Sequence, residues 1–233
     1  MTTVAIMQPY LFPYIGYYQL VACADVFVFL DDVRLIRRCY LNRNRLCDSH
    51  RQPVPFTVAV DHASQNRDIN EHRYLPHDGR LLKMLCHLYA RQPGYERYLP
   101  IISELLATLD ERSVAAVNAA SVTMLAREVG ITPRYLSSSE VDPQPTRRGQ
   151  DRILMLCQAL GADRYVNLPG GRALYEPSAF AACGIELHFL DTTADGVVSA
   201  DGTTWQPSFL HWVFTMNPPE IAAQLRRYSL SRN

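Results

Sequence analysis

The chain has 233 residues, enough for one large domain or two small ones, and its apolar fraction permits an ordinary hydrophobic core. Its 23 basic and 23 acidic residues cancel, so no global positive field favours nucleic acid or an anionic membrane as a partner. No run approaches the roughly 18 apolar residues of a membrane span, and Met1 leads into a strand instead of a signal peptide. We therefore predict a cytoplasmic protein without a membrane partner.

The first thirty residues predict one βαβ unit. Residues 4–7 are short, apolar and β-prone, residues 14–24 have helical spacing, and residues 26–30 form a second apolar strand. Because the crossover between two parallel strands is right-handed, both strands end at the same edge of the sheet. Open α/β sheets bind ligands at that edge. The polar residues that follow the two strands there are Gln8, Asp31 and Asp32.

The rest of the chain predicts a helical middle and a second βαβ pattern. In order, we expect a strand at 53–61, a polar loop at 63–76, helices at 81–89, 101–109 and 114–129, a loop at 138–148, a helix at 150–160, a strand at 164–167, a helix at 177–183 and a strand at 185–190. This order predicts a single α/β domain over 1–233, with a mostly parallel, nucleotide-binding-like sheet and a helical insertion or subdomain at about 78–130. The N- and C-terminal thirds should share that sheet around one site.

An ordered set of residues near the N-terminus has the pattern of a known family. The set consists of Gln8, Pro9, Tyr10, Phe12, Pro13, Gly16, Tyr17, Asp25, Asp31, Asp32, Arg37, Arg38, Asn42, Arg43, Asn44 and Arg45. With these residues the sequence resembles the WbqC-like protein family, and weaker similarity continues to Ser208. Members of this family are similar to proteins encoded among genes for surface polysaccharides and specialised metabolites. The resemblance therefore implies work on activated sugars, amino acids or acyl groups.

The loop between the first strand and helix is the first candidate binding segment. It looks like the place where class I nucleotidyl transferases carry His-x-Gly-His, but this chain has tyrosines in both histidine positions. The absence of the two histidines affects adenylyl transfer more than nucleotide binding, because their imidazoles stabilise the phosphate that is transferred. We predict a substrate-binding floor, with a tight aromatic turn as the alternative, made of Gln8, Tyr10, Tyr14, Gly16 and Tyr17.

The paired carboxylates Asp31 and Asp32 are candidate catalytic residues, for a general base, for orienting an amine or for binding magnesium. Adjacent residues of an extended chain point to opposite faces, so one of the two should enter a pocket while the other caps the following segment. No further carboxylate cluster and no Cys-x-x-Cys spacing supports a metal site, and none is predicted.

The densest basic stretch follows these carboxylates. If residues 40–46 are extended, Arg43 and Arg45 share one face and can clamp a phosphate or carboxylate, with Arg38 and Asn42 beside them. The alternative is a solvated loop paired with nearby aspartates. Cys39 lies among these arginines, whose charges favour the thiolate, so it is a candidate nucleophile. Family members usually have a small residue such as serine at that position.

Two departures from the family pattern stand elsewhere in the chain. His211 replaces a carboxylate that relatives tend to carry, which either alters acid–base chemistry or, as we expect, caps a helix. Leu81 replaces a histidine in the middle of the chain.

Three function classes follow. The first is transfer or hydrolysis of an activated acyl or aminoacyl group from a phosphopantetheine thioester, with a small-molecule or carrier-protein-linked substrate. In this class Arg43 and Arg45 bind the anion, Gln8 and Asn42 orient the substrate, and Asp31 or Asp32 is the base. The second is a nucleotide or nucleotide-sugar-dependent transferase, and the third is a non-catalytic scaffold. Nucleic acid is not an expected partner, and the sequence leaves the oligomeric state open.

Overall fold

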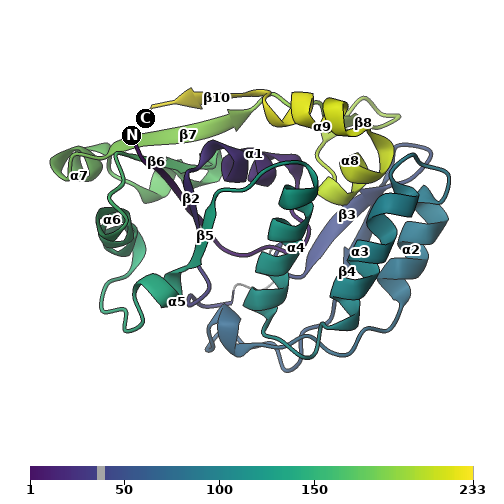
Figure 1. The fold of residues 1–233 in the computed structure, drawn as a ribbon, viewed down its shortest axis with the longest axis horizontal. Helices are drawn as coiled ribbons and strands as arrows, with labels where there is room; N and C mark the ends of the chain where they lie inside the picture. Colours follow the sequence, from purple (N-terminus) through teal and green to yellow (C-terminus); the bar gives the residue numbers. More distant parts are fainter. Residues whose placement is uncertain (36–39, 233) are drawn as a thin grey trace.

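The computed structural model describes residues 1–35 and 40–232 of the chain. Its centre is a six-stranded sheet in the order β10-β7-β6-β1-β2-β5, in which all neighbours are parallel except β10 (Figure 1). The strands are β1 (Thr3–Met7), β2 (Val26–Phe29), β5 (Arg134–Ser137), β6 (Arg164–Asn167), β7 (Glu186–Thr192) and β10 (Tyr228–Ser231). The predicted mostly parallel α/β fold is confirmed.

Strand β1 joins the two ends of the chain in one sheet. Val4 pairs with Val26 of β2 on one side and with Tyr165 of β6 on the other. The chain runs from β1 to β2 in one direction and, after β5, crosses back to β6 in the other. The point where the order reverses therefore lies between β1 and β6, and doubly wound sheets bind ligands at such a point, outside the carboxyl ends of the strands.

Helices cover both faces of the sheet, which explains why its central strands are apolar throughout. Ala5 and Phe27 face a core that includes α1 (Ile15–Cys23), whereas Val4 and Ile6 face α6 (Gly149–Ala159) and α7 (Pro177–Ala182). Because neighbouring residues of a strand point to opposite faces, one short strand contributes to both cores.

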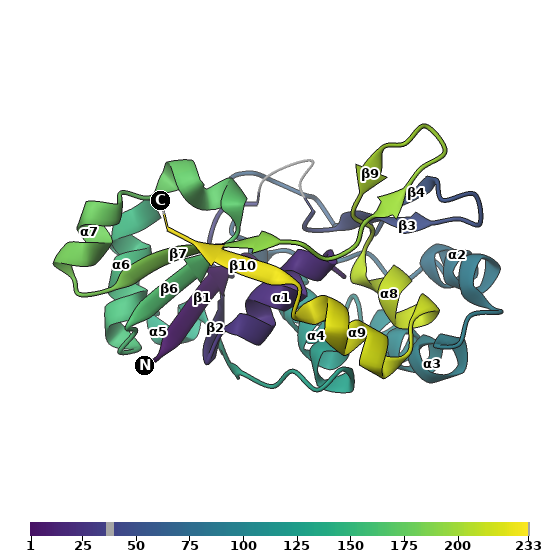
Figure 2. The same cartoon turned by 90° about the horizontal axis from the view of Figure 1, so that it is seen from above.

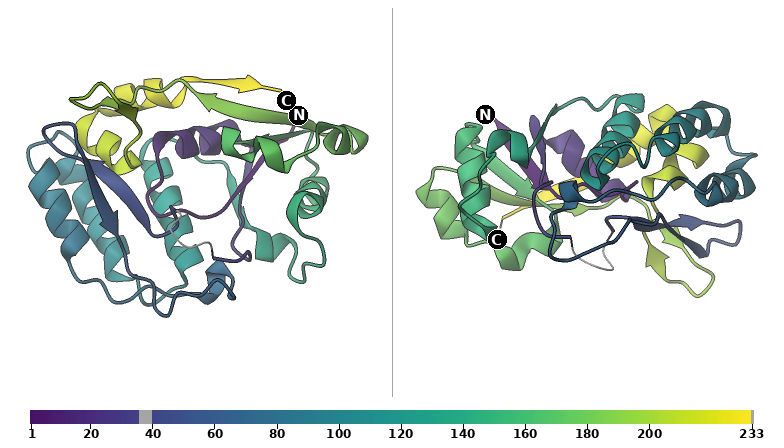
Figure 3. Two further views of the ribbon diagram at one scale, coloured as in Figure 1. Left: turned by 180° about the vertical axis from the view of Figure 1, so that it is seen from behind. Right: turned by 90° about the horizontal axis from the view of Figure 1, so that it is seen from below.

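The predicted helical insertion lies between β2 and β5. It contains the hairpin β3 (Arg43–Cys47) and β4 (Pro53–Thr57), the short helix η1 (Ile69–Glu71), and the helices α2 (Arg80–Tyr89), α3 (Tyr95–Ala107) and α4 (Val114–Glu128). The three longer helices stand side by side at one end of the molecule (Figures 1 and 3). Helix α3 begins six residues before the predicted start at 101, because Pro100 is accommodated inside it.

Several further elements were not expected from the sequence. Among them are β5, the short helix α5 (Ser138–Val141), which lies inside the predicted loop, the hairpin β8 (Val197–Val198) and β9 (Thr204–Trp205), and the edge strand β10. The β8–β9 hairpin stands beside the β3–β4 hairpin (Figure 2), where the Trp205 Nε1–H and the Ser199 hydroxyl both donate to the Arg51 carbonyl.

Three more helices complete the described chain. Helix η2 (Pro169–Leu174) follows β6, and α8 (Phe209–Thr215) and α9 (Pro218–Leu225) precede β10. Over residues 1–35 and 40–232, no helix has both the length and the apolar character that crossing a membrane requires.

Candidate functional site

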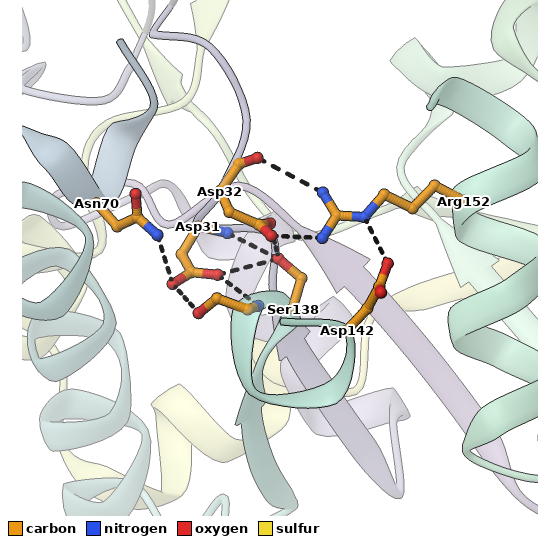
Figure 4. A network of polar contacts seen from close by, with 7 residues as sticks. Asp31, Asp32, Asn70, Ser138, Asp142 and Arg152 are labelled. Carbon is orange, nitrogen blue, oxygen red and sulfur yellow. Dashed lines mark hydrogen bonds and ion pairs between the residues drawn. The ribbon is translucent and has the colours of Figure 1, made fainter. Parts of the chain in front are cut away.

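Asp31, directly after β2, holds the start of α5 (Figure 4). Its Oδ1 accepts hydrogen bonds from the Ser139 N–H and the Ser138 hydroxyl, both at 3.0 Å, and its Oδ2 accepts from the Ser139 hydroxyl at 2.7 Å. The Asn70 amide reaches the same Oδ2 at 3.4 Å. Asp31 is 8% exposed. Its oxygens are therefore occupied by protein donors, and the side chain fastens the end of β2 to the end of β5.

Asp32 makes a different set of contacts, to α6. Its Oδ2 accepts from Arg152 Nη2 at 2.5 Å, and its Oδ1 lies 2.5 Å from the Ser138 hydroxyl, whose single hydrogen is shared between the two aspartates (Figure 4). The Arg152 guanidinium also lies 3.5 Å from Asp142 Oδ2 through Nε, and the Arg152 side chain is only 5% exposed. A buried arginine thus bridges two carboxylates, Asp32 after β2 and Asp142 after α5, that are far apart in the sequence.

A cavity of about 410 Å³ opens beside Asp32. It lies between the end of β2, the start of α6 and the end of η2. Its apolar walls are Leu30, Val33, Ile153 and Leu174, and its polar lining includes Asp32, Asp68, Gln150, Tyr175 and the arginines Arg34, Arg147, Arg148 and Arg152. We refer to it as the β2–α6 pocket. Its volume is in the range of small-molecule sites.

Two of the four arginines that line this pocket form ion pairs with aspartates, and the other two do not among the described residues. Arg152 is bound by Asp32 and Asp142, and Arg34 lies 3.4 Å from Asp68. By contrast, Arg147 and Arg148 are exposed and have no hydrogen bond or ion pair with any residue that the structure describes. They stand at the start of α6, where no side chain caps the free backbone N–H groups. Two guanidinium groups and a helix N-terminus at one mouth favour an anion.

Sequence reasoning placed Arg34 in the basic stretch but missed the other three arginines of this pocket, Arg147, Arg148 and Arg152. Residues 138–148 were interpreted as a loop, and the helix that follows was expected to start at 150, one residue after its observed start. The sequence feature that could have revealed them is the basic pair Arg147-Arg148 directly before a predicted helix. The positive charges of such a pair add to the positive end of the helix dipole, and together they attract an anion. Arg152 belongs to a stretch that resembles the family, but its partner Asp32 lies 120 positions away in the sequence.

The N-terminal loop residues pack mainly against one another. The Tyr17 hydroxyl donates to the Gln8 carbonyl at 2.9 Å, and the Tyr10 hydroxyl donates to Gln8 Oε1 at 3.4 Å. Burial raises the pKa of Tyr17 well above its usual value. The ring of Tyr14 lies so close to Gly16 that a Cβ there would stand 2.4 Å from the ring. The glycine thus makes room for the Tyr14 ring at the start of α1.

The residues of the basic stretch lie on the β3–β4 hairpin. The side-chain amides of Asn42 and Asn44 donate to the backbone carbonyls of Val58 and Phe12, each at 2.8 Å. Arg43 and Arg45 alternate with the buried Asn44 along β3. Both arginines line a cavity of about 360 Å³ that has no lining residue in common with the β2–α6 pocket. The predicted anion clamp and the predicted carboxylates are therefore in separate cavities.

Cys39 and Arg38 fall outside the described residues. The five described cysteines, Cys23, Cys47, Cys86, Cys157 and Cys183, are all free. Burial raises the pKa of Cys47 to about 11 and that of Cys157 to about 12, which disfavours the thiolate of each. Within the described part of the chain, no three His, Cys, Asp or Glu side chains gather as a metal site requires.

His211 does not cap its helix, so that expectation was wrong. Ser208 caps α8, since its hydroxyl accepts from the Leu210 N–H at 3.3 Å. His211 lies in the first turn instead, with Nδ1 3.3 Å from the Tyr89 hydroxyl, and burial lowers the pKa of its imidazole to about 4. The imidazole is therefore neutral near pH 7, and its ring packs against Tyr89, with the ring centroids 5.9 Å apart.

Comparison with known proteins gives one family and one distant relative. The sequence profile of the WbqC-like protein family matches residues 8–199. The chain is similar to the uncharacterized protein Rv1507c of Mycobacterium tuberculosis, with 26% identity over 198 residues that cover 82% of this chain and 83% of the relative. No solved structure matches the chain.

Proposed function

The chain belongs to the WbqC-like protein family, and from this premise we propose that it is a biosynthetic transferase that binds the phosphate of an activated donor in the β2–α6 pocket. The observation that carries the proposal is the pair Arg147 and Arg148 at the uncapped start of α6, without partners among the described residues. A phosphate there would receive backbone N–H donors and charge-assisted bonds together.

The walls of the pocket support a donor with an extended apolar arm. Leu30, Ile153 and Leu174 line it, and Leu174 is 67% exposed although it is apolar. Large apolar side chains at a cavity mouth are typical of surfaces that a ligand covers. We therefore favour a phosphopantetheine thioester that carries an acyl or aminoacyl group.

Asp32 supplies the reacting carboxylate in this proposal. An acceptor amine attacks the thioester carbonyl, the new C–N bond forms, the C–S bond breaks, and Asp32 takes the amine proton that finally leaves with the thiol. Arg152 keeps Asp32 oriented toward the pocket through the 2.5 Å contact. Asp31, which does not line the pocket and is bonded to Ser138 and Ser139, is a positioning residue.

A nucleotide-dependent transferase is the second candidate. The observation in its favour is the position of the pocket at the carboxyl end of β2, one strand away from the reversal point between β1 and β6, since doubly wound sheets bind nucleotides at this edge. Tyr14 and Tyr17 weigh against nucleotidyl transfer itself, since they stand where imidazoles would contact the phosphates.

Binding measurements distinguish the two candidates. Calorimetric titration of the full chain with phosphopantetheine, pantetheine, ATP and a nucleotide sugar compares donors with and without phosphate. We expect phosphopantetheine to bind at least about tenfold more tightly than pantetheine, and the variant Arg147→Ala/Arg148→Ala to lose this difference, because charge-assisted bonds are removed. The control Arg91→Ala/Arg127→Ala removes two exposed arginines that do not line the pocket.

The outcome of these titrations decides among the three function classes. Tighter binding of ATP or the nucleotide sugar, lost in the same double variant, would replace the thioester donor with the second candidate. Binding that is equal in the double variant and the control would overturn the phosphate site. Failure of every phosphorylated probe to bind would favour the scaffold class.

A further inference from the structure

A second cavity, of about 290 Å³, lies where the β1–α1 loop meets β3. Its lining includes Tyr10, Tyr14, Tyr40, Asn44, Arg45 and Gln206. None of these residues lines the β2–α6 pocket. The tyrosine cavity, as we name it, therefore needs an occupant of its own.

Aromatic side chains form much of its wall. The ring centroids of Tyr10 and Tyr40 are 6.4 Å apart, and the rings are tilted by 54°. Tyr40 is 53% exposed, whereas the Tyr14 ring is fixed against Gly16. Exposed tyrosine faces around a hollow favour a flat or ring-shaped ligand, because ring stacking covers apolar surface at low entropy cost.

The polar groups of the cavity include two donors, Arg45 and the Tyr14 hydroxyl, and one buried acceptor without a partner among the described residues, Gln206 Oε1. Arg45 lies over the Trp205 ring, with its guanidinium carbon 5.4 Å from the centroid. Across residues 1–35 and 40–232, no carboxylate pairs with Arg45, and no hydrogen-bond partner is found for the Tyr14 hydroxyl. Burial raises the pKa of Tyr14 to about 12, so the phenol keeps its proton.

The surroundings add positive charge and no negative charge. The neighbouring cavity shares Tyr40, Asn44 and Arg45 with the tyrosine cavity and adds Arg43. No Asp or Glu among the described residues lines either cavity. A cationic ligand would meet two arginines here, so the charges select against an amine and in favour of an acid.

We propose that the tyrosine cavity binds a small carboxylic acid built on a single six-membered ring. The carboxylate bonds to the Arg45 guanidinium, which matches its planar geometry, and the Tyr14 hydroxyl donates a further hydrogen bond. The ring lies against the faces of Tyr10 and Tyr40. The volume is at the lower end of ligand sites and suits one ring. A sugar acid and an aromatic acid share this chemistry.

If the chain is the transferase proposed above, this acid is the acceptor or part of it. That interpretation rests on the proposed function, whereas the binding proposal rests only on the cavity. The two fail separately, since they concern different residues and different probes.

Ligand-observed saturation-transfer NMR on the full chain tests the binding. The probes are glucuronate and benzoate, with glucose and benzyl alcohol as neutral partners of the same ring type. We expect at least one acid to bind about tenfold more tightly than its neutral partner, because a charge-assisted bond to arginine is worth about 1.5–3 kcal/mol. Glucuronate alone would identify a sugar-acid site, and benzoate alone an aromatic-acid site.

Variants show whether the preference comes from this cavity. Arg45→Gln should remove the preference for the acid, and Arg45→Lys should retain part of it, because the charge stays while the planar fork is lost. Arg147→Ala/Arg148→Ala should leave it unchanged. Since Arg45→Gln also removes the Trp205 contact, its thermal midpoint is measured in parallel, and Tyr40→Ala, at an exposed position, should weaken both acid and neutral probes. Equal binding of acids and neutral partners, or an unchanged preference in Arg45→Gln, overturns the proposal.

Discussion

At the scale of single residues, two neighbouring aspartates illustrate how position decides role. Asp31 and Asp32 follow the same strand and both accept hydrogen bonds from protein donors, but only Asp32 lines the β2–α6 pocket. One of the two was expected to enter a pocket and the other to cap the segment that follows. Asp32 lines the pocket, whereas Asp31 binds Ser138 and Ser139 at the start of α5 instead of the segment directly after it.

The bridge made by Arg152 gives the first prediction. Arg152→Met should lower the free energy of unfolding by about 3–5 kcal/mol, because it leaves Asp32 and Asp142 largely buried without a counter-charge. Arg97→Met is the matched control. Its pair with Glu128 at 2.9 Å has side chains 50% and 30% exposed, so its loss should cost less than about 1 kcal/mol. Urea unfolding of both variants measures the difference, and equal losses would contradict the prediction.

His211 gives the second prediction, a dependence of stability on pH. Its pKa is lowered to about 4 in the folded chain, so the unfolded chain, with the ordinary pKa of 6.5, binds more protons between pH 6.5 and 4. The free energy of unfolding should therefore fall by about 2 kcal/mol from pH 7 to pH 5. His211→Asn should flatten this fall in urea titrations. The measurements stop at pH 5, above the pH at which exposed carboxylates titrate. If the free energy of unfolding falls equally with pH in His211→Asn, groups other than His211 cause the fall.

At the scale of elements, close approach of backbones fixes how α3 meets α8. Gly94 precedes α3, and its N–H donates to the Phe214 carbonyl at 2.9 Å. A Cβ on Gly94 would stand 2.0 Å from the Val213 carbonyl oxygen, which belongs to helix backbone and has little freedom to move. The glycine is what lets the two helices touch.

The third prediction follows from this contact. Gly94→Ala should lower the free energy of unfolding by more than about 2 kcal/mol, since overpacking against backbone displaces a whole helix. Gly170→Ala is the control, because a Cβ there meets nothing within 4 Å. Its effect should be within about 0.5 kcal/mol. Thermal unfolding followed by circular dichroism compares the two variants. If Gly94→Ala is as stable as the control, α8 can shift freely and the prediction is wrong.

Elements with a strong apolar period were predictable, and those made by tertiary contacts were not. Residues 164–167 and 114–129 were predicted within a residue of the observed β6 and α4. Strand β5 was missed because Arg134-Tyr135-Leu136-Ser137 is partly exposed and short, so nothing in its composition separates it from a loop. It is a strand because it pairs with β2. Arg147, Arg148 and Arg152 of the β2–α6 pocket were missed for the same reason, since only the fold brings α6 to β2.

At the scale of the whole molecule, the sheet has a buried core on each face. Phe27 packs with α1 and the helices of the insertion, and Phe189 packs with α6 and α7. Both rings are 0% exposed. Because β1 and β2 contribute side chains to both cores, we propose that the two faces unfold together as one domain.

The fourth prediction tests this cooperativity. Phe27→Ala and Phe189→Ala should each cost about 3–5 kcal/mol. Trp205 and Trp212 both lie in the core that contains Phe27, so their fluorescence reports on that side only. If the molecule is one cooperative unit, Phe189→Ala should shift the fluorescence midpoint in urea as far as the circular dichroism midpoint. An unshifted fluorescence midpoint would mean that the two faces unfold separately.

The central position of β1 also has a consequence for how the protein is made. This strand is synthesised before the other strands of the sheet, yet one of its two partners, β6, follows about 160 residues later. At about 5–20 residues per second, that partner is synthesised roughly ten seconds or more after β1. Until then the β1–α1–β2 unit has an unpaired strand edge and two uncovered apolar faces. Nascent chains should therefore depend on chaperones through most of translation, and the sheet should close only when the last third of the chain arrives.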